Sequence, residues 1–185
     1  MIHDVHLRVR RSVLALLLCV AACTTEQAPP AAQNKNPASS DQAPPANWDP
    51  AYWDRSMRDA RDLRDRGDRG AAEHACARGI LYVQAQTIKV LYGYADVLDQ
   101  QSLGSGIPMR SKVQKLEQAR NSSNTYLGFD PSAELRNYAD LLAGMKRKNE
   151  ALLAEALAAA YRYAQEANMR RATLQREGKD PIGEC

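Results

Sequence analysis

From residue 49 onward, the chain is rich in Ala, Leu, Arg, Glu and Gln, and β-branched residues are sparse. The first group favours helices, whereas Val, Ile and Thr favour strands. Apolar residues in this part recur at helical spacing rather than in alternation. We therefore expect an all-α domain over residues 49–177, followed by a C-terminal tail at 178–185.

Two helix starts are marked by the same dipeptide. Asp49-Pro50 and Asp130-Pro131 each place a capping carboxylate before a proline at the first helical position, where the missing N–H costs nothing. The run Gly104-Ser105-Gly106-Ile107-Pro108 is typical of a break between helices. The expected helices are 50–66, 71–101, 109–121 and 131–176, the last either unbroken or with a turn near 144–149.

A short pattern occurs in two full copies and one partial copy. Tyr94-Ala95-Asp96-Val97-Leu98 recurs as Tyr138-Ala139-Asp140-Leu141-Leu142, and Ala60-Arg61-Asp62-Leu63 is the partial copy. The segments 60–73 and 138–153, which contain the first and last copies, resemble the helical hairpins of the tetratricopeptide family, whose period is about 34 residues. That resemblance implies a short hairpin array. The alternative is an antiparallel helical bundle, in which small residues recur because helices pack closely there.

The segment before the helical domain has the composition of a linker. Residues 24–48 contain five prolines and no large apolar residue before Trp48. Such a segment cannot bury enough apolar surface to offset the entropy lost on ordering. We predict a disordered Pro/Ala-rich tether here.

The N-terminus has the features of a secretory signal. Arg10-Arg11 precedes a short apolar run, and small residues follow it. The run is too short to span a membrane, which needs about 20 apolar residues. The sequence Val20-Ala21-Ala22-Cys23 resembles the lipobox of bacterial lipoproteins. The resemblance implies that residues 1–22 are removed and that the sulfur of Cys23 carries diacylglycerol, usually followed by N-acylation.

Lipid attachment would determine where the protein resides. Two or three acyl chains, at about 0.8 kcal/mol per buried methylene, hold a protein on a membrane without a spanning helix. In the lipoprotein family, an Asp after the lipidated cysteine often retains the protein in the inner membrane, and this chain has Thr24 instead. We expect a lipid-anchored protein of the bacterial envelope, in the outer membrane and facing the periplasm.

The net charge gives no indication of nucleic-acid binding. The chain carries +3, of which the signal segment contributes +2 through three arginines and Asp4, so +1 remains. A nearly neutral, exported chain lacks the basic surface that nucleic acids require.

Two cysteines remain after processing, because Cys19 leaves with the signal and Cys23 is lipidated. Cys76 and Cys185 form an even pair in an oxidising compartment, which makes them a disulfide candidate. A bridge within one chain, a bridge between two chains and free thiols all stay open.

Few residues offer reactive chemistry. His74 is the one histidine left after processing, and it stands two positions from Cys76, so the two side chains point in different directions on a helix. The sequence has no Gly-rich phosphate loop and no Cys-x-x-Cys motif. We expect no catalytic residues, no metal and no cofactor.

Tyrosine is over-represented, with eight tyrosines against one phenylalanine. Tyrosine combines a large contact area with a polar tip, which suits interfaces. These residues are either a partner-binding face or packing residues whose hydroxyls reach solvent. The candidates on the long helices are Tyr82, Tyr92, Tyr94, Tyr138, Tyr161 and Tyr163.

The anchor, the linker and the scarcity of reactive chemistry favour a non-catalytic function. Our first hypothesis is an adaptor or assembly factor that binds another envelope protein. The second is a structural lipoprotein that self-associates as a homo-oligomer or contacts the cell wall. The third is an enzyme.

Overall fold

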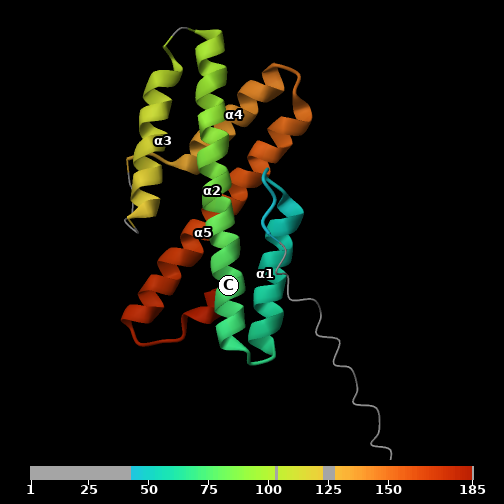
Figure 1. Ribbon diagram of the computed structural model, residues 1–185, viewed down its shortest axis with the longest axis vertical. Coiled ribbons are helices and arrows are strands. Elements are labelled where there is room, and N and C mark those ends of the chain that lie inside the picture. Colours follow the sequence, from blue (N-terminus) through green and yellow to red (C-terminus); the bar gives the residue numbers. More distant parts are fainter. Residues whose placement is uncertain (1–42, 103, 123–127, 185) are drawn as a thin grey trace, which may run out of the picture. The chain divides into compact units, whose positions relative to one another are not determined.

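The computed structural model describes residues 43–102, 104–122 and 128–184. The signal segment, Cys23, the linker up to residue 42 and Cys185 lie outside the described residues. The regular elements of the described part are all helical, which confirms the all-α prediction. They are α1 (Pro50–Asp65), α2 (Arg69–Gln101), α3 (Gly106–Asn121), α4 (Pro131–Gly144), α5 (Lys148–Arg176) and the 3₁₀ turn η1 (Pro181–Glu184) (Figure 1).

The long helix α2 is the element on which the others pack. It contacts α1, α3, α4, α5 and η1, while α4 and α5 also pack on each other. Figure 1 shows α1 beside one half of α2 and α3 beside the other. One helix shared by two neighbours in this way differs from an array of separate hairpins. The described part of the chain is therefore a helical bundle.

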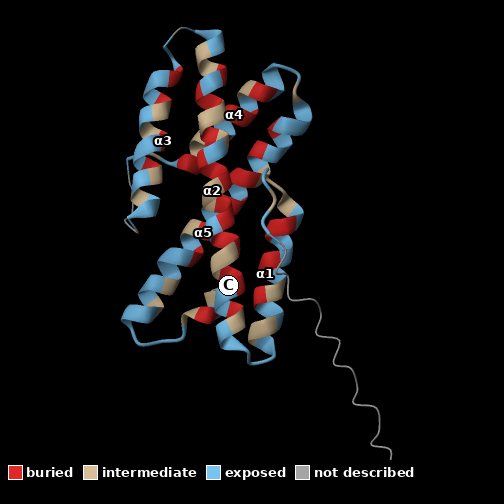
Figure 2. Ribbon diagram, in the orientation of Figure 1, coloured by how far each residue is buried: buried red, intermediate tan, exposed pale blue. Residues whose placement is uncertain are grey.

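Burial follows this arrangement. Buried residues occur along α2 from Ala72 to Val97, whereas the outer sides of α3 and α5 are exposed (Figure 2). The largest fully buried side chains come from several helices, so one core runs through the bundle. They are Leu91, Leu135, Leu142, Leu157, Val83, Val113, Thr87 and Cys76.

The short repeated pattern has a packing explanation. Its three alanines, Ala60, Ala95 and Ala139, are between 0% and 1% exposed. The tyrosines of the two full copies, Tyr94 and Tyr138, stack with ring centroids 5.0 Å apart and an interplanar angle of 30°. The copies therefore mark close contacts between α1, α2 and α4, where only a small side chain fits.

Both predicted Asp-Pro helix starts are confirmed. The Asp49 carboxylate accepts a hydrogen bond from the Ala51 N–H at 2.9 Å, and Asp130 accepts one from the Ser132 N–H at the same distance. α2 begins two residues earlier than predicted, because Asp68 also acts as an N-cap and accepts from the Ala71 N–H at 3.1 Å.

The predicted start of the third helix at residue 109 is wrong. α3 begins at Gly106 and includes Pro108 in its first turn. The first four N–H groups of a helix have no partner within it, so a proline there removes no helical hydrogen bond. The segment that resembled a break is therefore partly a helix start.

The last helical stretch turns, as in the second of the two predicted forms. α4 ends at Gly144, and α5 starts at Lys148. Lys146 between them has a φ of 62°, in the left-handed region. Its N–H donates to the Ala143 carbonyl at 3.0 Å, and the Arg147 N–H donates to the Leu142 carbonyl at 2.9 Å. This is a Schellman cap, with lysine at the position that glycine usually takes.

One carboxylate joins the end of α2 to the start of α3. Asp99 on α2 accepts a hydrogen bond from Arg110 on α3 and another from the Gly106 N–H, the latter at 2.7 Å. Arg110 also bonds to Asp96 at 2.7 Å. The Arg110 guanidinium and then the Gly106 N–H hold the pKa of Asp99 below its usual value. Here α3 lies directly against the backbone of α2.

We predict that Gly106→Ala destabilises the bundle by about 1–3 kcal/mol, the usual range for overpacking. A Cβ at this position would lie 2.1 Å from the carbonyl oxygen of Ala95, and backbone cannot move aside cheaply. Gly70→Ala is the matched control, because a Cβ there meets nothing within 4 Å. Urea denaturation of both variants measures the difference. Equal midpoints would contradict the close approach of α3 to α2.

Candidate partner-binding site

The last residues of the predicted tether are held against α2. We call residues 43–48 the strap. The Tyr82 hydroxyl donates to the Asn47 carbonyl at 2.8 Å and accepts from the Asp49 N–H at 2.7 Å. Trp48 stacks on the ring of Tyr82, with centroids 5.6 Å apart. One buried tyrosine therefore holds the strap to the bundle.

Two further side chains of α2 bind the strap. Lys89 donates to the Ala46 carbonyl at 2.9 Å and to the Asn47 carboxamide oxygen at 2.8 Å. The Gln86 amide donates to the Ala46 carbonyl at 3.3 Å and to the Pro45 carbonyl at 3.4 Å. These bonds satisfy backbone acceptors of the strap, so its few apolar residues need not supply all of its stabilisation. Residues 43–48, which the sequence assigned to the tether, are thus attached to the bundle.

The strap, α2, α4 and α5 together enclose a groove of about 250 Å³, which we call the Trp48 groove. Its walls are mainly apolar, and Lys89 and Glu150 are its charged residues. Glu150 is already paired with Arg147 through two hydrogen bonds, at 2.7 and 2.5 Å. The lining residues are Asn47, Trp48, Gln86, Lys89, Val90, Gly93, Tyr138, Leu142, Glu150, Leu153 and Ala154.

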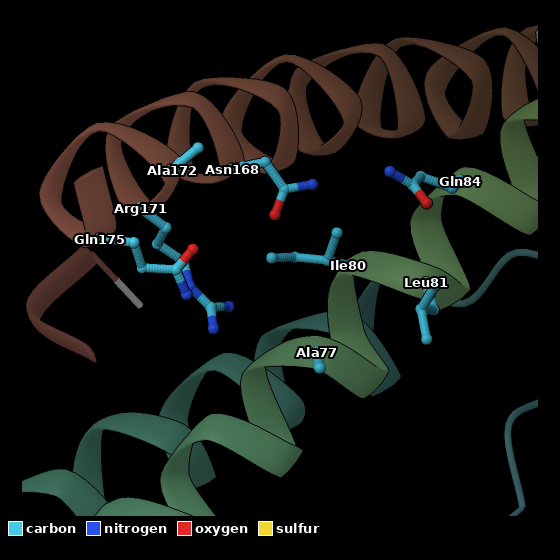
Figure 3. A pocket seen from close by; sticks show the side chains of 8 residues that line it. All are labelled: Ala77, Ile80, Leu81, Gln84, Asn168, Arg171, Ala172 and Gln175. Atoms are coloured by element: carbon cyan, nitrogen blue, oxygen red, sulfur yellow. The ribbon is translucent and has the colours of Figure 1, made fainter. Parts of the chain in front are cut away.

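A second groove, of about 340 Å³, lies between α2 and α5. Figure 3 shows Gln84 and Asn168 facing each other across it from the two helices, with Ile80 pointing into it from α2. Its one charged lining residue is Arg171, which bonds to Glu73 at 3.0 Å and to the sulfur of Cys76 at 3.3 Å. That guanidinium is therefore already engaged within the bundle.

The six tyrosines singled out in the sequence do not form one exposed face. Tyr82, Tyr94, Tyr138 and Tyr161 are buried. Tyr92 is partly buried, and its hydroxyl bonds to Glu117 at 3.1 Å. Tyr163 is 39% exposed, and its ring forms a T-shaped contact with that of Trp53. The four buried tyrosines are therefore packing residues, which was the alternative to a partner-binding face.

Burial changes the acidity of these phenols. It raises the pKa of Tyr82, Tyr92, Tyr94 and Tyr138 above the ordinary value of 10.0. It raises the pKa of Tyr161 to about 12, with a smaller contribution from the negative charge of Asp130. A raised pKa means that the folded state favours the neutral phenol more than the unfolded chain does.

We predict an alkaline loss of stability that depends on Tyr161. Because its folded pKa is raised, its contribution is fully present below pH 10 and is lost as the pH rises from 10 to about 12. The loss from this residue should be on the order of 2–3 kcal/mol. Tyr161→Phe should reduce the pH dependence of the urea midpoint over that range. Tyr163→Phe is the control, and an equal effect of both substitutions would contradict the prediction.

Cys76, one of the two candidate disulfide cysteines, is buried and disulfide-bonded in the structure. The other three cysteines lie outside the described residues, so its pairing with Cys185 stays a prediction. The tail supports it by returning to the bundle. Ile182 is buried, and Glu184 pairs with Arg170 at 2.6 Å. Arg170 is next to Arg171, which contacts the Cys76 sulfur.

We predict an intramolecular Cys76–Cys185 bridge. The exported protein should then contain no free thiol and should run faster on a non-reducing gel than on a reducing one. Reduction should lower the free energy of unfolding by about 2–5 kcal/mol, since the bridge closes a long loop. A dimer that disappears with reductant would indicate the intermolecular bridge instead. Complete maleimide labelling of two thiols would contradict both.

The described residues offer no arrangement suited to a metal. His74 is exposed while Cys76 is buried, so the two do not face a common site. No group of three His, Cys, Asp or Glu side chains within the described ranges is placed to hold an ion. None of the helices in the described part is both long enough and apolar enough to cross a membrane.

Among the residues that line the Trp48 groove, Tyr138 was a candidate from the sequence, and the others were not identified. Trp48 directly precedes the N-cap Asp49, a position where an apolar side chain often packs on the following helix, and this signal was available. Lys89, Gln86 and Gly93 carry no motif. Comparison of the chain with protein-family models, with characterised proteins and with solved structures gives no match.

Proposed function

We propose that this protein is a bacterial envelope lipoprotein that acts without catalysis, as an adaptor or assembly factor for another envelope protein. The sequence Val20-Ala21-Ala22-Cys23, behind a basic and apolar start, is the observation that carries the proposal. Diacylglycerol on Cys23 would anchor the chain, and the Pro-rich segment would present the bundle to its partner.

The strap supports this arrangement by defining the length of the tether. Nineteen residues, 24–42, separate the lipidated cysteine from the strap. A flexible coil of that length spans roughly 25 Å, and a fully extended polyproline II segment spans at most about 60 Å. The bundle would therefore work within this distance of the lipid surface, and it would always be pulled from the same point on α2.

The bundle favours the adaptor function over a purely structural one. It has an open apolar groove, and an apolar pocket with a few polar groups is the usual form of a binding site. Self-association through scattered exposed apolar residues is the alternative. The mass of the purified protein measured by light scattering over a range of concentrations would separate the two, because an adaptor without its partner stays monomeric.

We predict that Cys23→Ala abolishes lipid attachment and leaves the precursor unprocessed, because the thiol is the acylation site in the lipoproteins that the motif resembles. Metabolic labelling with a radioactive fatty acid, followed by membrane fractionation, measures both effects. Cys19→Ala is the matched control and should keep its label. A Cys23→Ala protein that still takes up the label and fractionates with membranes would contradict the lipoprotein proposal.

A further inference from the structure

We infer that the Trp48 groove is the docking site for the partner, and that it accepts one large apolar side chain from an acidic segment of that protein. This inference rests on the proposed adaptor function and names the surface and the chemistry of the contact. It draws on the size of the groove, on a glycine that nothing in the described structure requires and on an uncompensated positive charge.

The size of the groove suits a single side chain. Sites for small molecules and cofactors usually measure about 300–1,000 Å³ and enclose most of the ligand. The Trp48 groove measures about 250 Å³ and opens between four segments of the chain. A single aromatic or large aliphatic side chain fits this volume, and such anchors supply most of the binding energy at protein interfaces.

Gly93 keeps the wall of the groove open. It lies in the interior of α2, where glycine costs about 1 kcal/mol relative to alanine. A Cβ on Gly93 would meet no atom within 4 Å, so nothing in the described structure requires a glycine there. By contrast, a Cβ on Gly79, in the same helix, would lie 2.5 Å from Met57. The space above Gly93 is available to a group from outside the bundle.

Two polar atoms of the lining lack a hydrogen bond. The indole N–H of Trp48 and the carboxamide oxygen of Gln86 are buried and have no partner among the described residues. Gln86 as a whole is only 6% exposed. An unpaired buried polar atom costs about 1–3 kcal/mol. Both residues that bear these unpaired atoms line the groove.

The charge of the lining favours an acidic partner. The ammonium of Lys89 has three N–H donors, of which two bind neutral oxygens of the strap. Within the described ranges, Lys89 forms no ion pair, whereas Glu150 is neutralised by Arg147. The groove therefore presents one uncompensated positive charge beside apolar walls. The groove between α2 and α5 lacks this feature, because its Arg171 is already paired with Glu73.

Cross-linking in cells separates this inference from the proposed function. A photo-reactive amino acid is placed in turn at Leu153 in the Trp48 groove, at Leu81 in the groove between α2 and α5, and at Ile107 on α3, all exposed in the bundle. We expect a cross-link from position 153 to an acidic segment of another envelope protein. Cross-links from position 81 or 107 but not 153 would overturn the docking site and leave the adaptor function standing.

Two other outcomes of this experiment bear on the proposed function itself. Cross-links only between copies of this chain would replace the adaptor function with self-association. The absence of cross-links from all three positions would contradict both the docking site and the adaptor function.

Binding of defined peptides tests the chemistry with the full mature chain in detergent. The probe is a fluorescent peptide with one Phe between Asp residues, and the comparison peptide has Lys in place of Asp. The acidic peptide should bind at least about tenfold more tightly than the basic one. Gly93→Leu should weaken its binding by about 30-fold or more, because the new side chain fills the groove. Lys89→Glu should weaken it by about tenfold, and Lys89→Arg should retain it.

The controls match each change. Gly70→Leu adds the same side chain to α2 at another glycine with open space, and Lys115→Glu makes the same charge change on an exposed part of α3. Both should bind the acidic peptide as the unaltered protein does, and circular dichroism should show all variants folded. Equal binding of the two peptides, unchanged binding by Gly93→Leu, or no binding of the acidic peptide would each overturn the inference.

Discussion

The burial of α2 on several sides is the constraint on which the rest of this bundle depends. Each of the other described elements packs on it, and Val83, Thr87 and Leu91 near its middle are fully buried. Removing one such Leu side chain usually costs about 2–5 kcal/mol, while a whole domain is stable by only about 5–15 kcal/mol. A single defect in this helix would therefore weaken the contacts of several neighbours at once.

The helix boundaries were predictable where the chain uses the common residues for starting and ending a helix. Asp-Pro caps and the spacing of apolar residues were sufficient to place the helices within a few residues. The turn between α4 and α5 was ambiguous because its left-handed residue is Lys146, and no glycine marks the position. Pro108 was misleading for the opposite reason, since proline breaks a helix in its interior but is harmless in its first turn.

The site was less predictable than the fold. Excess tyrosine pointed to a binding face, but the rings of Tyr94 and Tyr138 serve a contact between two helices that no local pattern reveals. The strap was not predicted, because amino-acid composition shows only how much apolar surface a segment can bury. The hydrogen bonds of this segment are made mainly by its backbone carbonyl groups. Those acceptors are the same in every sequence. Two features distinguish this strap from an unattached linker: the stacking of Trp48 on Tyr82, and the donors on α2, which are Tyr82, Gln86 and Lys89.

The strap is also part of the groove. Asn47 and Trp48 line the groove, so the groove has all of its walls only while the strap lies on α2. Lys89 contributes to the strap and to the groove. Two of its N–H groups hold the strap, and its charge is the positive charge of the groove. The neutral hydrogen bonds of the strap contribute only about 1 kcal/mol each, and the bonds from the Lys89 ammonium contribute about 1.5–3 kcal/mol each. The attachment of the strap and the completeness of the groove therefore depend on the same few bonds.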